Sequence, residues 1–176
     1  DGEEAVAVGE FAGGAVDAGE PVAHRLLRVG GDRVDVLGEA GAKALADMFA
    51  RYRVARMYAD PRHFETQIDA WASEHGEDVV VQFPTNSITR MFPALVRYRE
   101  DMAELLTTHD DDPTYRSHAL AARKVAKPGD KFILGKPSEH QRIDVLMADA
   151  IAYEARADAL ASGWTEHAES TMYVFD

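Results

Sequence analysis

The sequence "RMYADPRHFE", residues 56–65, decides the fold that we predict for this chain. Its first four residues continue an apolar run that begins at Val54, and this run has the length of a short buried strand. From Pro61 to His75, apolar side chains recur at the spacing of an α-helix. A strand that leads directly into a helix is typical of α/β proteins, in which binding sites lie at the carboxyl ends of strands. Asp60 occupies such a strand end.

Two interpretations of Asp60 follow from its neighbours. Asp is a preferred residue at the N-cap of a helix, and Pro is favoured at the first helical position, so Asp60 is predicted to cap a helix that begins at Pro61. The other interpretation is that Asp60 is one of several carboxylates that hold metal ions. The two roles are compatible, because a carboxylate has two oxygens and several lone pairs.

The rest of the chain alternates in the same way. The pattern predicts strands at residues 5–11, 22–29, 33–37, 54–59, 78–83 and 130–135. It predicts helices at residues 39–52, 61–75, 85–106, about 113–124 and 138–161. The strands at 22–29 and 33–37 flank a Gly-Gly-Asp turn and form a predicted β-hairpin. The fold class is therefore α/β, a mixed β-sheet flanked by helices, with residues 1–163 as one domain and residues 164–176 as a C-terminal tail.

Composition limits the class of protein. The chain has 176 residues, 46% of them hydrophobic, which suits one domain with a sizeable core. It has no cysteine, which excludes disulfides and thiolate metal sites and predicts a reducing, cytoplasmic setting. No apolar run reaches the length of a membrane span, and the N-terminus lacks the order of a signal peptide. The missing initiator methionine suggests a fragment of a longer protein.

The charge of the chain is unevenly distributed. The net charge of −12 argues against a surface coated by nucleic acid, because counterion release requires clustered Lys and Arg. Between residues 116 and 142, however, the sequence contains seven basic residues and only two acidic ones. The basic residues are Arg116, Arg123, Lys124, Lys127, Lys131, Lys136 and Arg142. Such a run is either a solvated surface or a surface that contacts phosphate.

A second carboxylate, Asp144, lies on the last predicted helix. Ser138 and Gln141 form a capping box, so this helix is predicted to begin at Ser138. Asp144 then lies at the edge of the apolar stripe, where a carboxylate is costly unless it is paired, and a metal ion is one possible partner. Asp149 is about 140° further around the helix, so it is not expected to face the same site. The alternative is that either aspartate is a surface charge.

The first strand offers weaker candidates. Glu10 ends the run "AVAVGE", Asp17 follows in a loop, and Asp1 begins the chain. Other sites are not indicated. The histidines lack the spacing of zinc sites, and there is no Gly-rich phosphate loop or serine-hydrolase elbow.

Four segments follow one another in a defined order: "YADP" (58–61), "TN" (85–86), "THDDDP" (108–113) with His118 downstream, and "RIDVLMADAIAYEA" (142–155). In this order and spacing they resemble the C-terminal nuclease domain of actinobacteriophage large terminase subunits. The resemblance covers residues 51–163. It implies a ribonuclease H-like fold with acidic residues on the first strand, at the end of a central strand and on the C-terminal helix.

The resemblance also implies a set of site residues. Asp60 and Asp144 fall on the second and third acidic positions, and Glu10 stands where the first acid is expected. This sequence departs from the family there, since the family carries an aspartate in a "DG" step. It also has Ala121 where family members tend to carry Asn after His118. By resemblance, Glu10, Asp60 and Asp144 are the expected catalytic metal ligands.

The implied function is metal-dependent cleavage of concatemeric viral DNA during genome packaging. Two Mg²⁺ or Mn²⁺ ions would clamp the scissile phosphate, and such hard cations prefer carboxylate oxygens. Arg90, Arg123 and Lys124 are the expected contacts to the DNA backbone. The implied partners are double-stranded DNA, an upstream ATPase domain of the same protein, the small terminase subunit and the portal, in the cytoplasm of an infected bacterial host, with no membrane.

Two alternatives stay open. One is another ribonuclease H-like nuclease of the resolvase type, and the other is a degenerate domain that binds DNA or a protein partner without catalysis.

Overall fold

The computed structural model describes residues 7–8, 13–14, 28–29, 39–62, 64–107 and 112–164. Its central feature is a parallel three-stranded sheet in the order β1-β4-β5, with β1 at Ala7–Val8, β4 at Arg56–Ala59 and β5 at Val80–Gln82. Val8 is opposite Met57 in the register, and Met57 is opposite Val80. The stretch that begins at Arg56 therefore forms the central strand, as its apolar pattern predicts.

Two antiparallel strand pairs lie apart from this sheet in the hydrogen-bonding pattern. One joins β2 (Gly13–Gly14) to β3 (Arg28–Val29), and the other joins β6 (Arg123–Lys127) to β7 (Lys131–Gly135). The prediction of a single mixed sheet is therefore wrong for the described residues, because their parallel and antiparallel pairs form separate sheets. The predicted hairpin at residues 22–37 lies largely outside the described residues.

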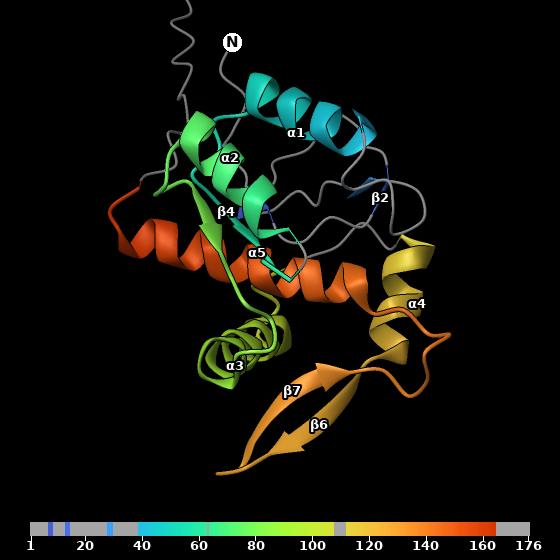
Figure 1. The fold of residues 1–176 in the computed structure, drawn as a ribbon. Coiled ribbons are helices and arrows are strands. Elements are labelled where there is room, and N and C mark those ends of the chain that lie inside the picture. Colours follow the sequence, from blue (N-terminus) through green and yellow to red (C-terminus); the bar gives the residue numbers. More distant parts are fainter. Residues whose placement is uncertain are drawn as a thin grey trace, which may run out of the picture.

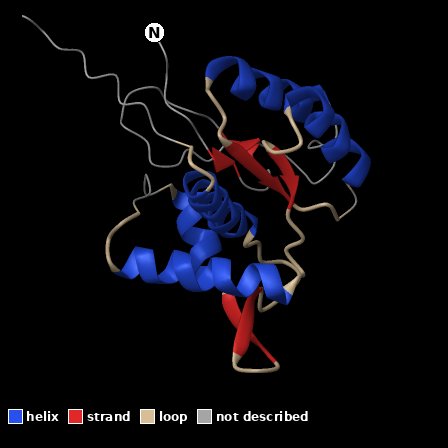
Figure 2. Cartoon of the chain, turned by 90° about the vertical axis from the view of Figure 1, so that its left-hand side faces the viewer, coloured by secondary structure: helices blue, strands red, loops and turns tan. Residues whose placement is uncertain are grey.

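Five helices complete the described fold: α1 (Glu39–Arg51), α2 (Glu65–His75), α3 (Ile88–Ala103), α4 (Pro113–Ala121) and α5 (Asp144–Ala161). Figure 1 shows α1 and α2 on one side of the parallel sheet, and α3 and α5 on the other. Figure 2 shows the same separation from the side, with the β6–β7 pair extending away from the helices at the lower end. The α/β class predicted from the sequence is confirmed.

The side chains of β4 explain why helices cover both faces. Met57 and Ala59 pack into a cluster with residues of α1 and α2, whereas Tyr58 packs into a cluster with residues of α3, α4 and α5. Alternate residues of a strand point to opposite faces, so a strand that is apolar at consecutive positions needs cover on both. Met57 and Tyr58 are both buried.

Two predicted helix starts are wrong. The first helix after β4 begins at Glu65 rather than Pro61: the backbone N–H of Phe64 closes a turn on the carbonyl of Pro61 (2.8 Å) before the helix begins, and Asp60 accepts a hydrogen bond from the backbone N–H of Arg62 (3.2 Å). The N-cap position belongs to Phe64, whose side chain forms no cap hydrogen bond.

The last helix begins at Asp144 rather than Ser138. The predicted capping box is not formed, since the backbone N–H of Gln141 closes a turn on the carbonyl of Ser138 (3.2 Å) before the helix begins. A third boundary also differs: α4 ends at Ala121, and Arg123 and Lys124 belong to strand β6 rather than to a helix.

Candidate functional site

Asp60 lies directly after β4, half-buried, at the carboxyl end of the sheet. One carboxylate oxygen accepts the backbone N–H of Arg62, and the other accepts the hydroxyl of Thr85, which follows β5. Each oxygen keeps a further lone pair. Asp60 therefore joins the two segments that follow the neighbouring strands. The two hydrogen bonds hold its carboxylate in one orientation.

Asp144 lies on a different element, as the first residue of α5, and its side chain is exposed. Its backbone is held from both sides, because Ile143 and Val145 are buried. The backbone N–H of Val145 donates to Nδ1 of the buried His118 on α4 (3.1 Å). This bond satisfies one of the free amides at the helix start, a role that a side chain close in sequence usually takes.

Contacts between β4 and α5 set the direction in which the two elements cross. Arg56 donates to the hydroxyl of Ser162 (3.3 Å), and Tyr58 donates to Asp158, so β4 runs from the C-terminal end of α5 toward its middle. By strand alternation, Asp60 follows Arg56 and Tyr58 on the same side. The α5 partners of Arg56 and Tyr58, Ser162 and Asp158, are four residues apart, so the helix position expected opposite Asp60 is Glu154. Asp144 lies ten residues before Glu154, which is about 15 Å along the helix axis.

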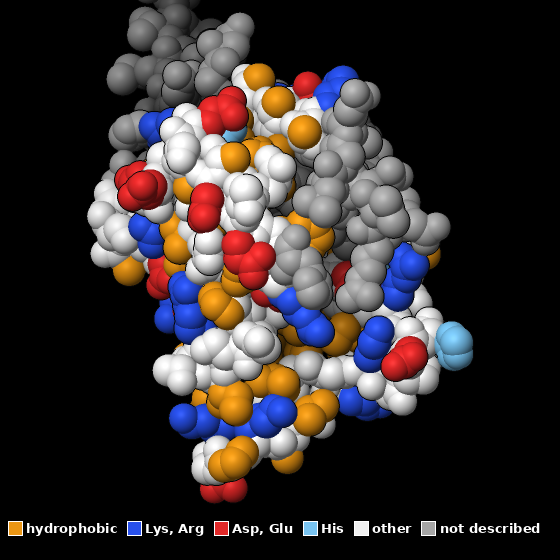
Figure 3. Space-filling view, viewed as in Figure 1, with side chains coloured by type: hydrophobic (Ala, Val, Ile, Leu, Met, Phe, Trp, Pro, Cys, Tyr) orange, Lys and Arg blue, Asp and Glu red, His pale blue; other side chains and the backbone are white. Residues whose placement is uncertain are grey.

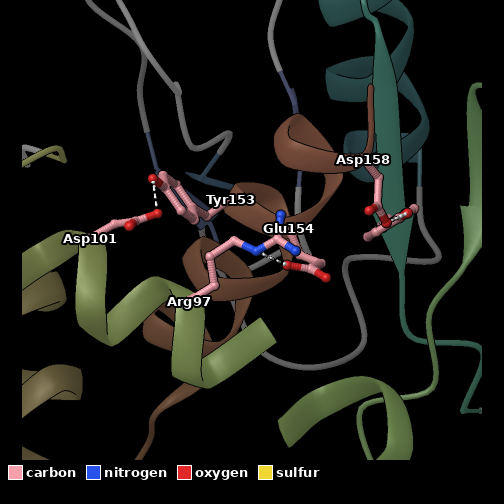
Figure 4. Close-up of polar contacts among 6 residues, drawn as sticks. Arg97, Asp101, Tyr153, Glu154 and Asp158 are labelled. Carbon is pink, nitrogen blue, oxygen red and sulfur yellow. Dashed lines mark hydrogen bonds and ion pairs between the residues drawn. The ribbon is translucent and has the colours of Figure 1, made fainter. Parts of the chain in front are cut away.

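Glu154 is a buried carboxylate that the sequence pattern does not single out. It is 9% exposed, its Oε2 accepts no hydrogen bond from the described residues, and Nε of Arg97 lies 3.5 Å away (Figure 4). Burial is the main cause of the raised pKa of Glu154; Asp158 raises it further, whereas Arg97 and Arg90 act in the opposite direction. Burial disfavours the charged form of a carboxyl group, which explains the sign.

Two tyrosines bind other carboxylates in this region. Tyr153 donates to Asp101 on α3 (2.6 Å), as Figure 4 shows, and burial together with this bond raises the pKa of Tyr153 to about 12. Burial and the bond to Asp158 likewise raise the pKa of Tyr58 to about 12. Both hydroxyls therefore remain protonated donors across the physiological range.

A third polar cluster lies deeper in the core. Asp149 is 3% exposed and accepts hydrogen bonds from the hydroxyls of Tyr98 and Tyr115, which are 2.7 Å from one another. Burial is the main cause of the raised pKa of both tyrosines, and Asp149 adds to it. This cluster joins α3, α4 and α5 and confirms that Asp149 and Asp144 do not face one site, since one is buried and the other exposed.

The predicted metal ligands can be compared with these positions. Glu10 lies outside the described residues, as do the alternatives Asp17 and Asp1. Asp60 directly follows β4, which packs against α5, but the contacts between the two elements bring Asp60 toward Glu154 and leave Asp144 about 15 Å away along the helix axis. The part of the chain that the structure describes contains no group of three or more Asp, Glu or His side chains that could hold a metal ion. The carboxylate chemistry suits a hard divalent cation, but the described residues alone supply an incomplete set.

The predicted DNA contacts have internal partners. The guanidinium of Arg90 donates to the carbonyl of Gln82 (2.8 Å) and lies 4.3 Å from the ring centre of Phe83. Arg123 donates to the carbonyls of Leu120 and Ala122 at the end of α4 (2.7 and 2.8 Å).

Lys124, the third predicted contact, places its ammonium 4.5 Å from the ring centre of Phe132. All three cations thus contribute to the fold. Whether they also contact DNA stays a prediction.

A hollow opens beside the start of α5. Its lining comes from α4 and from the segment before α5: Ser117, His118, Leu120, Ala121, His140, Gln141 and Arg142. Asp144 follows this lining by two residues in the chain. The hollow is open to solvent, and its lining includes two histidines and an arginine.

Comparison with known proteins gives one distant relative. The chain is 26% identical over 125 residues to the Gene 13 protein of Mycobacterium phage L5, a match that covers 65% of this chain and 21% of the relative. The chain thus spans about a fifth of the length of that phage protein. No protein-family model matches the chain, and no solved structure matches it. Among the described residues, no helix is both long and apolar enough to cross a bilayer.

Proposed function

We propose that this chain is the metal-dependent DNA endonuclease domain of a phage terminase large subunit, with a ribonuclease H-like fold. The observation that carries the proposal is the position of Asp60, at the carboxyl end of the central strand of a parallel sheet with α5 packed across it. Open α/β sheets place their sites at this edge. The similarity to a protein of a mycobacteriophage supports a phage origin.

The proposed ligands come from three parts of the chain. Glu10 is two residues beyond Val8 and Asp60 three beyond Met57, and Val8 and Met57 are opposite one another on parallel strands. Asp144 is the third proposed ligand, from the start of α5. Mg²⁺ or Mn²⁺ ions, when bound, would polarise the scissile phosphate and activate water. The residues of the chain orient the carboxylates: Thr85 and Arg62 fix Asp60, and His118 fixes the backbone next to Asp144.

The test is cleavage of supercoiled plasmid DNA in the presence of Mn²⁺. Asp60→Ala and Asp144→Ala are each expected to lower the cleavage rate by about 100-fold or more, because electrostatic groups that act on the transition state have effects of this size. Glu74→Ala is the matched control, since Glu74 is an exposed carboxylate on α2. Helix α2 covers the face of the sheet opposite to the one that α5 covers. Circular dichroism shows whether each variant is folded.

The outcomes separate the alternatives. Absence of cleavage by the wild-type chain would favour a degenerate domain that only binds. Full activity of Asp144→Ala together with loss of activity in Glu154→Gln would assign the ligand on α5 to Glu154 instead. An ATPase domain upstream in the same reading frame would distinguish a terminase from a resolvase-type enzyme.

A further inference from the structure

The β6–β7 pair is a two-stranded ribbon with two different faces. Residues that are opposite one another in an antiparallel pair point to the same face, and the face alternates along each strand. Lys124 is opposite Leu134 and Ala126 is opposite Phe132, so these four share one face. Phe132 packs edge-on against Phe92 of α3, with ring centres 5.4 Å apart. This is the inner face of the ribbon.

The outer face carries the remaining cations. Arg123 is opposite Gly135, Val125 is opposite Ile133, and Lys127 is opposite Lys131. Lys127 and Lys131 are adjacent across the two strands near the turn, where like charges repel unless an anion is present. Neither ammonium group has a hydrogen-bond or ion-pair partner among the described residues, in contrast to Arg123.

The close packing of the two strands fixes this arrangement. A Cβ atom added at Gly135 would lie 2.5 Å from Cγ2 of Val125, so the glycine allows Val125 to cover the end of the outer face. Phe132 anchors the opposite face on α3. The ribbon is therefore attached through β7, whose Phe132, Ile133 and Leu134 pack against the core, and its turn extends from the molecule (Figures 1 and 2).

The ribbon is basic in an acidic protein. Residues 123–136 contain five basic side chains and one acidic one, Asp130, whereas the whole chain has a net charge of −12. Figure 3 shows Lys and Arg side chains on either side of apolar ones at this end of the molecule. A local positive surface on a negative protein can direct a polyanion to one place and keep it from the rest.

We propose that the outer face of the β6–β7 ribbon binds the phosphate backbone of duplex DNA through Lys127 and Lys131. This inference rests on the proposed function, which supplies DNA as the substrate, and it adds two residues beyond Arg123 and Lys124. The contacts are to phosphate and carry no sequence preference. The ribbon is a positioning surface, since its lysines hold the duplex while the carboxylates at the sheet edge act on it.

The test measures the salt dependence of binding to a duplex, in EDTA, by fluorescence anisotropy. Each phosphate contact contributes about −0.9 to the slope of log K against log salt, so Lys127→Ala/Lys131→Ala is expected to reduce the magnitude of the slope by about 1.8. Lys43→Ala/Arg51→Ala on α1 is the matched control. It removes two exposed cations and thus the same net charge, but on the opposite face of the sheet.

Three results would overturn the inference. The first is an unchanged slope in Lys127→Ala/Lys131→Ala, and the second is an equal reduction in the α1 variant, which would indicate an effect of net charge alone. The third is a wild-type chain that shows no salt-dependent binding to duplex DNA. Because EDTA prevents metal-dependent cleavage, each result stands whether or not the chain cuts DNA. Failure of the nuclease proposal is read separately in the plasmid assay.

Discussion

Glu154, Asp158 and Asp149 lie on one helix, and each is accommodated by a different partner. Asp149 accepts two tyrosine hydroxyls and Asp158 accepts the hydroxyl of Tyr58. Among the described residues, Glu154 has a guanidinium 3.5 Å from its Oε2 and no hydrogen-bond donor to that oxygen. A buried carboxylate that lacks hydrogen bonds is costly in its charged form. Burial raises the pKa of Glu154, so the ionisation of this carboxyl group opposes folding.

Replacement of Glu154 by Gln tests this cost. The pKa of Glu154 is higher in the folded state than in the unfolded chain, so its contribution to stability is complete below the unfolded pKa and is lost as pH rises through the folded pKa. Gln stays neutral, so the free energy of unfolding of Glu154→Gln, relative to wild type, is expected to increase with pH above about 4.3. A pKa difference of one corresponds to about 1.4 kcal/mol.

Urea titrations at a series of pH values measure the effect. Glu74→Gln is the control, because it makes the same replacement at an exposed carboxylate on α2. A constant difference between Glu154→Gln and wild type across the pH range would show that the carboxylate ionises without cost.

At the scale of single residues, sequence reasoning found positions more reliably than partners. Asp60 lies at a strand end as predicted, because the apolar run and the proline next to it are local signals. The partner of Asp60, Thr85, is 25 residues away, and Tyr98 is 51 residues from Asp149. Such pairs depend on how the helices pack against one another, and the residues close to each partner in the sequence carry no signal of this packing. The recurrence of Asp149 and Glu154 within an alanine-rich helix was the available signal for buried acids.

At the scale of elements, α5 shows how a helix can begin without a cap of its own. Its N-cap residue, Ile143, has no side-chain oxygen, and no local side chain caps the helix. His118 on α4 supplies the acceptor instead, across 27 residues of sequence. The capping-box prediction at Ser138 is wrong for this reason: the helix begins where another helix holds it.

Replacement of His118 tests this long-range cap. His118→Leu removes the acceptor and leaves the N–H of Val145 buried, so we expect a loss of about 1–3 kcal/mol in the free energy of unfolding, measured by urea denaturation. His118→Asn places an amide oxygen near the former position of Nδ1 and is expected to recover part of this loss. Equal losses in the two variants would show that the hydrogen bond to Val145 contributes nothing. Because Asp144 precedes Val145, the same bond fixes the backbone of a proposed ligand.

Element boundaries were less predictable than element types. The apolar runs predict β4, β5 and β7 within a few residues, since buried strands require apolar side chains on both faces. Strand β6 was missed because its sequence, "RKVAK", is mostly polar and exposed, and it is a strand only by pairing with β7. One strand of the ribbon that carries our DNA-binding inference, β6, is thus the element that pattern alone could not reveal.

At the scale of the whole molecule, the described part of the parallel sheet divides the core into two clusters. One lies under α1 and α2 and includes Trp71 and Met57, and the other lies under α3, α4 and α5 and includes Ile151. Strand β4 connects the two clusters, because its consecutive residues belong to opposite ones. If the sheet transmits stability between them, the molecule should unfold as one cooperative unit.

Ile151→Ala tests this coupling. Ile151 is fully buried, so the truncation is expected to cost about 2–5 kcal/mol. In a Trp164→Phe background, Trp71 is the remaining tryptophan and reports on the opposite cluster. The urea midpoint of Trp71 fluorescence is expected to shift by the same amount as the midpoint of far-UV circular dichroism. Met57→Ala, a truncation in the cluster of Trp71, is likewise expected to shift both midpoints equally. A Trp71 midpoint that does not move in Ile151→Ala would show that the two faces of the sheet unfold independently, and that the edge carrying Asp60 can persist when α5 is lost.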